Sequence, residues 1–140
     1  MKKVMVFGVF DLLHPGHISF MKQAKKLGSY LIVSVARDVN VKKIKGKSPI
    51  FSEKKRVEHV QALKIANEVV LGGIKDPWPH IKKEQPDIIA LGYDQQPYIT
   101  NHVTRNMKQE LQKHGLKTKV VRLKPFRPQV FKSSIIRRKR

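Results

Sequence analysis

Residues 8–17 of the chain read Gly8-Val9-Phe10-Asp11-Leu12-Leu13-His14-Pro15-Gly16-His17, and they directly follow an apolar run at residues 4–7. The run is typical of a strand that is buried on both faces. Gly8 allows the backbone to turn sharply, and Pro15 has the fixed φ that is favoured in the first turn of a helix. The stretch therefore predicts a strand, a tight loop and a helix, with both histidines where the helix begins.

The two histidines of this stretch are candidates for binding an anion. A helix N-terminus carries unpaired N–H groups and a partial positive charge, which favour a phosphate, and Gly16 leaves room for one. His14 and His17 lie three residues apart and share a helix face, so both can donate hydrogen bonds to charge that grows in a transition state. Zinc binding is the alternative, but the chain has no cysteine and no other histidine cluster nearby.

The rest of the chain predicts a doubly wound α/β fold. Apolar residues at Ile18, Met21, Ala24 and Leu27 favour an amphipathic helix that Gly28 ends, and a second buried strand follows at residues 30–36. Strand, helix and strand make a right-handed βαβ unit with parallel strands. Helices are expected from Ser52 and over 76–84 and 99–111, and strands over 68–71, 88–91 and 118–123, the last at a sheet edge. The prediction is one Rossmann-like domain with a five-stranded, mainly parallel sheet.

Composition limits the partners. The 140 residues suffice for one domain, the longest apolar runs are far shorter than a membrane span, and the start has no signal-peptide pattern, so we expect a cytoplasmic protein. Thirty Lys and Arg against ten Asp and Glu give a formal charge of +20. This charge fits anionic substrates, a nucleic-acid surface or a solvated basic face. Because the lysines are spread along the chain and only the tail at 124–140 is a cluster, anionic substrates with a solvated face are favoured.

The unbroken pattern G-x-F-D-x-x-H-x-G-H from Gly8 to His17 resembles that of the HxGH nucleotidyltransferases, in particular the cytidylyltransferase-like group. The resemblance implies a nucleotidyltransferase domain over residues 1–140. Such enzymes join a nucleoside triphosphate to a phosphate-bearing acceptor and release pyrophosphate. The resemblance assigns His14 and His17 to contacts with the triphosphate. It also implies that the nucleotide contacts Gly8, Val9, Phe10, Asp11, Pro15 and Gly16.

Cations beyond the signature are further candidates. Residues 39–51 are lysine-rich, and Pro49 favours a loop over a long helix there. The segment is similar to the family's lysine-bearing segment, which implies phosphate contacts for Lys45 and Lys47. Arg56 fits a family pattern S-x-x-x-R that reaches the phosphates, and it is the third catalytic candidate. The alternatives are a solvated loop and an exposed helix charge.

The loop after the expected strand at 88–91 begins Gly92-Tyr93-Asp94-Gln95. Carboxyl ends of parallel strands form one edge of a sheet, so this loop should lie beside the histidine loop. Gly92 and Asp94 are expected to contact the nucleotide. The Asp94 carboxylate would bind Mg²⁺ or accept a hydrogen bond from a ribose hydroxyl. In the tail, the resemblance extends to a Ser/Thr segment that contacts nucleotide, and it implies this role for Arg127, Ser133 and Ser134.

The substrates are the least constrained prediction. The Tyr93 variant of the loop resembles that of the archaeal FAD synthases, which favours transfer of AMP from ATP to FMN, giving FAD and pyrophosphate with Mg²⁺. The alternative is a CTP-dependent enzyme acting on a small polyol phosphate such as glycerol 3-phosphate. An alternative of another class is a basic nucleic-acid-binding module, but the complete signature argues against it. The resemblance also implies a homodimer, and no membrane partner is expected.

Overall fold

Helices and strands alternate along the chain. The computed structural model describes residues 2–73, 78–92 and 107–124. In chain order its elements are β1 (Lys3–Gly8), α1 (Pro15–Lys26), β2 (Tyr30–Val35), α2 (Asp38–Lys45), α3 (Glu53–Ala62), β3 (Glu68–Leu71), α4 (Trp78–Glu84), β4 (Ile88–Leu91), α5 (Met107–Lys113) and β5 (Lys119–Arg122). Every predicted strand is present, and the α/β class is confirmed.

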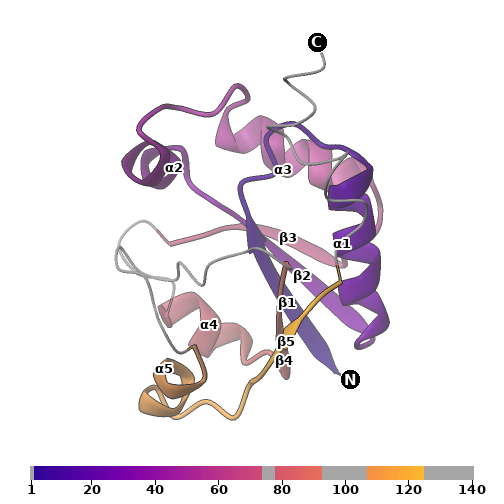
Figure 1. Ribbon diagram of the computed structural model, residues 1–140, viewed down its shortest axis with the longest axis vertical. Coiled ribbons are helices and arrows are strands. Elements are labelled where there is room, and N and C mark those ends of the chain that lie inside the picture. The colour runs from indigo at the N-terminus through magenta and orange to yellow at the C-terminus, as the bar shows by residue number, and fades with distance from the viewer. Residues whose placement is uncertain (1, 74–77, 93–106, 125–140) are drawn as a thin grey trace.

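The five strands form one sheet in the order β3-β2-β1-β4-β5, and each neighbouring pair is parallel. The chain begins at the central strand, builds outward to β3, and then returns to the other side of β1 to build outward to β5 (Figure 1). This reversal is the doubly wound topology, and the prediction that β5 lies at an edge is confirmed. Because β1 and β4 are parallel neighbours, the segments that follow them leave the sheet side by side, where ligands bind in this fold.

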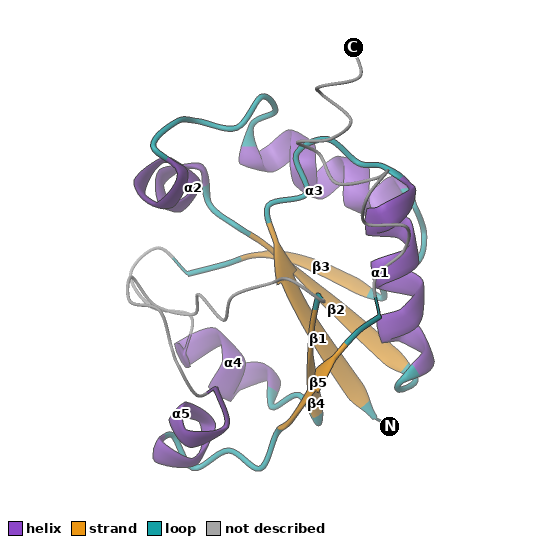
Figure 2. Ribbon diagram, viewed as in Figure 1, coloured by secondary structure: helices purple, strands orange, loops and turns teal. Residues whose placement is uncertain are grey.

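Helices cover both faces of the sheet (Figure 2). On one face Met21 and Ala24 of α1 and Val60 of α3 pack against β1, β2 and β4, and on the other face Trp78, Ile81 and Leu111 of α4 and α5 do so. Residues 4–6 of β1 and 31–33 of β2 alternate between the two clusters and are buried. Burial on both faces explains why these stretches are continuously apolar.

Helix α2 corrects the prediction of a loop at residues 39–51. An eight-residue helix forms there, with Asp38 in its first turn, lysines in its last turn and Val41 buried. Gly46 ends it in the left-handed conformation, with φ of 78° and its N–H donating to the Lys42 carbonyl. Pro49 lies beyond this cap and therefore limits the length of the helix without preventing it.

The structural roles of Gly8 and Gly28 differ from those predicted. The sharp turn after β1 occurs at Phe10, which has φ of 53°, while a Cβ at Gly8 would lie 2.7 Å from the Phe10 ring. Gly8 is therefore needed for close packing of Phe10. Helix α1 ends through Leu27 in an ordinary right-handed conformation, and a Cβ at Gly28 would lie 2.5 Å from the Lys2 carbonyl oxygen. The need for glycine at position 28 is again close approach of the backbone.

Most of the other local predictions are confirmed. The Ser52 hydroxyl accepts the N–H of Lys55 at the start of α3, and Trp78 is buried and stacks on His114 at 4.2 Å. Ala62, the last residue of α3, is exposed. Of the helix expected over 99–111, residues 99–106 lie outside the described part, and α5 covers the rest. No helix in the described ranges has the length and apolarity to cross a membrane.

Candidate active site

The two histidines lie together at the start of α1, as predicted. His14 is the N-cap residue, and its Nδ1 accepts the backbone N–H of Gly16 at 3.0 Å. This bond places the proton of a neutral His14 ring on Nε2, from which it can be donated to a ligand. The centroid of the His17 ring lies 4.0 Å from that of the His14 ring and 5.7 Å from that of the Phe10 ring, with which it forms a T-shaped pair. Both imidazole rings therefore lie together at the N-terminus of α1.

The site keeps both imidazoles neutral. Burial is the main cause that lowers the pKa of His17 to about 4; electrostatic repulsion from His14 and Lys45 contributes to the same shift, and the Leu12 backbone opposes it. Burial also lowers the pKa of His14. The Nδ1 atom of His17 is buried and has no hydrogen-bond partner among the described residues. A neutral imidazole at pH 7 acts here as a hydrogen-bond donor that an anionic ligand would approach.

Acid should destabilise the fold through His17. The unfolded chain protonates this group near pH 6.5 and the folded chain near pH 4, so the unfolded state binds more protons between these values. The free energy of unfolding should therefore fall by up to about 3 kcal/mol as the pH drops from 6.5 to 4, and this contribution is fully present above pH 6.5. Urea titrations across this range, compared with those of His17→Gln, measure the contribution. An identical loss in the variant would contradict it.

Lys45 lies close enough to His17 to affect its protonation. It is in the last turn of α2, and its side chain is exposed. The structure thus brings His14 and His17 into ring contact, and the charge of Lys45 contributes to the lowered pKa of His17. Lys47 is also exposed and follows the Gly46 cap, and its contact with phosphate stays a prediction.

Arg56 differs from the other candidate cations because it is fully buried. Its Nη1 donates to the Val9 carbonyl at 2.8 Å, its Nε donates to the Phe51 carbonyl at 3.1 Å, and its Nη2 forms an ion pair with Asp38 at 2.6 Å. The alternative of an exposed helix charge is therefore wrong. Each of the three guanidinium nitrogens is directed at a protein acceptor, and a phosphate contact stays a prediction.

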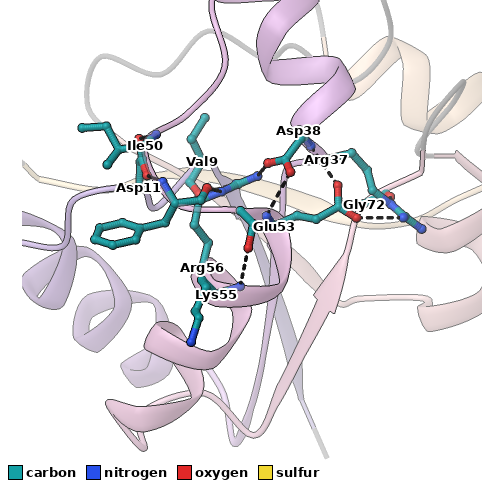
Figure 3. A network of polar contacts seen from close by, with 11 residues as sticks. Val9, Asp11, Arg37, Asp38, Ile50, Glu53, Lys55, Arg56 and Gly72 are labelled. Atoms are coloured by element: carbon teal, nitrogen blue, oxygen red, sulfur yellow. Dashed lines mark hydrogen bonds and ion pairs between the residues drawn. The ribbon is translucent and has the colours of Figure 1, made fainter.

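Asp38 was not among the residues predicted for the site. It lies one residue after the Arg37 N-cap of α2, close to the carboxyl end of β2. That position was the available signal, since the strand ends of a parallel sheet surround the ligand site. Its carboxylate also accepts the Glu53 N–H, and Glu53 accepts the Asp38 N–H in return (Figure 3).

The remaining predicted residues fall into two groups. Within the signature, Val9 is engaged through its carbonyl, the Phe10 ring is buried in the core, and the Asp11 carboxylate accepts two backbone N–H groups, from Ile50 and Phe51. Gly92 directly follows β4, and its carbonyl accepts from Arg122. The second group lies outside the described residues: Asp94, Arg127, Ser133 and Ser134.

The described residues include no group of three or more His, Cys, Asp or Glu side chains arranged to hold a metal ion. Asp11 lies in the histidine loop, but its two oxygens already accept backbone N–H groups at 2.7 and 2.8 Å. The two histidines lack further ligands of this kind, so the described geometry gives no support to the zinc alternative.

Comparison with known proteins identifies the family of this chain. The model of the cytidylyltransferase-like family matches residues 5–139. The chain is 48% identical over 125 residues to a protein named FAD synthase from Ferroglobus placidus, covering 89% of this chain and 77% of the relative, and 49% identical over 123 residues to a FAD synthase from Methanosarcina barkeri, covering 88% and 84%. The chain belongs to the cytidylyltransferase-like family.

Solved structures support the same fold. The chain superposes with a TM-score of 0.80 and 39% identity on a protein from Thermoplasma volcanium described as a lipopolysaccharide core biosynthesis protein, over 90% of this chain and 98% of that one. It also superposes with a TM-score of 0.59 on pantoate-beta-alanine ligase from Francisella tularensis, over 97% of this chain and 67% of that one. At 16% identity the second likeness shows the fold alone.

Proposed function

We propose that this protein is a FAD synthase, an adenylyltransferase that transfers AMP from ATP to FMN and releases pyrophosphate. The observation that carries the proposal is the pair of neutral imidazoles at the N-terminus of α1, whose ring centroids lie 4.0 Å apart. Relatives that are 42–49% identical over most of the chain and are named FAD synthase supply the substrates.

The proposed reaction is a single in-line displacement. An oxygen of the FMN phosphate attacks the α-phosphorus of ATP, the bond from that phosphorus to the bridging oxygen breaks, and pyrophosphate leaves with the electron pair. The acceptor phosphate is already ionised, so no strong general base is needed. The protein contributes positioning and charge stabilisation, which carry most of the catalysis in transfers of this kind.

The two histidines, the two lysines and the start of α1 each have a role in this reaction. The N–H groups of His14 and His17 and the start of α1 donate to the triphosphate oxygens as negative charge moves toward the leaving group. Lys45, with Lys47, balances that charge. Gly16 leaves space for the phosphates, and Pro15 fixes the start of the helix.

ATP is taken in this proposal as its Mg²⁺ complex, which shields the charge of the triphosphate. Asp94 would contact the metal or the ribose, and Gly92, Arg127, Ser133 and Ser134 would complete the nucleotide site. We also propose a cytoplasmic location and a homodimer.

The proposal is tested with purified protein and Mg²⁺ in four mixtures that combine ATP or CTP with FMN or glycerol 3-phosphate. FAD separated by chromatography and an equal amount of pyrophosphate are expected only with ATP and FMN. CTP with glycerol 3-phosphate giving product would establish a cytidylyltransferase instead. Salt-sensitive RNA binding with no transfer in any mixture would favour the nucleic-acid module.

Lys45→Gln should weaken the use of ATP without unfolding the protein. Loss of one charge-assisted contact to the triphosphate is expected to lower kcat/KM for ATP about tenfold or more. The matched control is Lys43→Gln, which removes an exposed lysine two residues away on α2, a spacing that places it on another side of the helix. Steady-state assays at saturating FMN measure kcat/KM for both variants. Equal losses in the two would mean that Lys45 attracts ATP only through its positive charge and makes no specific contact.

A further inference from the structure

A polar network links the histidine loop to the segment that carries the lysines. Its members come from the loop after β1, the starts of α2 and α3, and the segment between these two helices (Figure 3). The signature assigned Asp11 to the nucleotide and the pattern S-x-x-x-R assigned Arg56 to the phosphates, but in the structure both side chains bind the protein itself. Their geometry therefore calls for another role.

The first connection is made by Asp11. Its two carboxylate oxygens accept the N–H of Ile50 at 2.7 Å and the N–H of Phe51 at 2.8 Å. These amides belong to the segment at residues 46–52, which joins the end of α2 to the start of α3. The carboxylate of the histidine loop thus fixes the backbone of the lysine-bearing segment directly.

The second connection is made by Arg56 and its counter-ion. The buried guanidinium joins a carbonyl of the histidine loop, that of Val9, to a carbonyl of the segment, that of Phe51. Asp38, whose side chain is 40% exposed, balances the charge from the start of α2. A buried guanidinium without this carboxylate would be costly, so Asp38 determines whether Arg56 stays in place.

The third connection closes the segment on itself. Asp38 and Glu53 each accept the other's backbone N–H, at 3.2 and 3.0 Å, so the starts of α2 and α3 are joined. Arg37 then pairs with Glu53 at 3.1 Å and donates to the Gly72 carbonyl after β3. Residues 38–53 form a closed loop that is anchored to the strand ends on one side and to the histidine loop on the other.

We propose that Asp11, Asp38 and Arg56 are positioning residues that set the distance between Lys45 and the two histidines. Lys45 lies inside the closed loop, between the anchored start of α2 and the amides held by Asp11, so its place relative to His17 depends on these contacts. The inference deepens the proposed function and rests on it for the role of the lysine.

The test is a double-mutant cycle between Asp11→Ala and Lys45→Gln. Displacing Lys45 should lower kcat/KM for ATP about 10–100-fold in Asp11→Ala. If Asp11 acts through Lys45, most of that loss disappears in the Lys45→Gln background, because the lysine it positions is already gone. Asp38→Asn should behave in the same way, and Asp38→Glu should recover part of the activity. The matched control, Glu58→Gln, removes an exposed carboxylate on α3 whose ion pair with Lys55 lies outside the network.

A second readout does not depend on FAD formation. NMR titration of His17 should show its pKa rising in folded Asp11→Ala, because the neighbouring charge of Lys45 moves away. Circular dichroism confirms that the variant is folded, and Asp11→Asn replaces it if it is not. Additive losses in the cycle together with an unchanged His17 pKa would overturn the inference. Absence of FAD formation by the wild type, with the His17 pKa still shifted by the variant, would overturn the proposed function alone.

Discussion

Replacing His17 with glutamine is expected to lower kcat for FAD formation about 10²–10³-fold, the range found when one hydrogen-bond donor to developing charge is removed. KM for ATP should change less, because the donor matters most when charge accumulates on the leaving pyrophosphate. Glutamine keeps a polar N–H group of similar reach, so the loss measures the position and acidity of the imidazole donor. The measurement is steady-state kinetics with saturating FMN over a range of ATP concentrations.

The neighbouring imidazole sharpens the same test. His14 and His17 stack at 4.0 Å and face the same helix N-terminus, so removing both should cost less than the product of the single losses. His114→Gln is the matched control, because that ring stacks on Trp78, on the face of the sheet that α4 and α5 cover. Activity of His17→Gln within a fewfold of wild type would contradict a direct role in transfer.

Binding of pyrophosphate gives an independent check on these histidines. An anion beside His17 favours its protonated form, so the pKa should rise from about 4 when pyrophosphate binds. An unchanged pKa at saturating pyrophosphate would place the anion elsewhere.

The sheet, and the edge of it at which the strands end beside the histidine loop, could be predicted because their causes are local. Residues 4–7 and 31–33 are continuous apolar runs, and Pro15 and Ser52 mark helix starts through backbone geometry and capping that involve only a few neighbouring residues. The adjacency of the carboxyl ends of β1 and β4 then follows from the parallel topology. Even the missed helix α2 carried local signals, an acid in its first turn, lysines in its last turn and Gly46 after it.

The polar network could not be predicted in this way, because its partners are brought together by the fold. The contacts of Arg56 with Val9 and Asp38 span 47 and 18 residues of sequence, and a chain with 30 basic residues gives no reason to single out one arginine as buried. The family pattern selected Asp11 and Arg56 as ligand-contacting residues. In the structure both side chains contact other parts of the chain, and the pattern alone does not distinguish these two kinds of contact.

Stability should depend strongly on the same arginine. Arg56→Met is expected to lower the free energy of unfolding by about 3 kcal/mol, at the lower end of the range for removing one partner of a buried ion pair. Methionine fills similar space, but the carbonyls of Val9 and Phe51 lose their donors. Asp38 keeps access to water, since 40% of its side chain is exposed, and this limits the cost.

Urea unfolding at pH 7 measures this loss, with Lys55→Met as the matched control. Lys55 is the adjacent residue on α3 and is 65% exposed, and its ion pair with Glu58 at 3.8 Å should contribute less than about 1 kcal/mol. Arg56→Lys should fall between the two, because one ammonium group cannot reach three acceptors in the fixed fork of a guanidinium. A loss under about 1 kcal/mol in Arg56→Met would mean that the burial of this charge costs as much as its three contacts return.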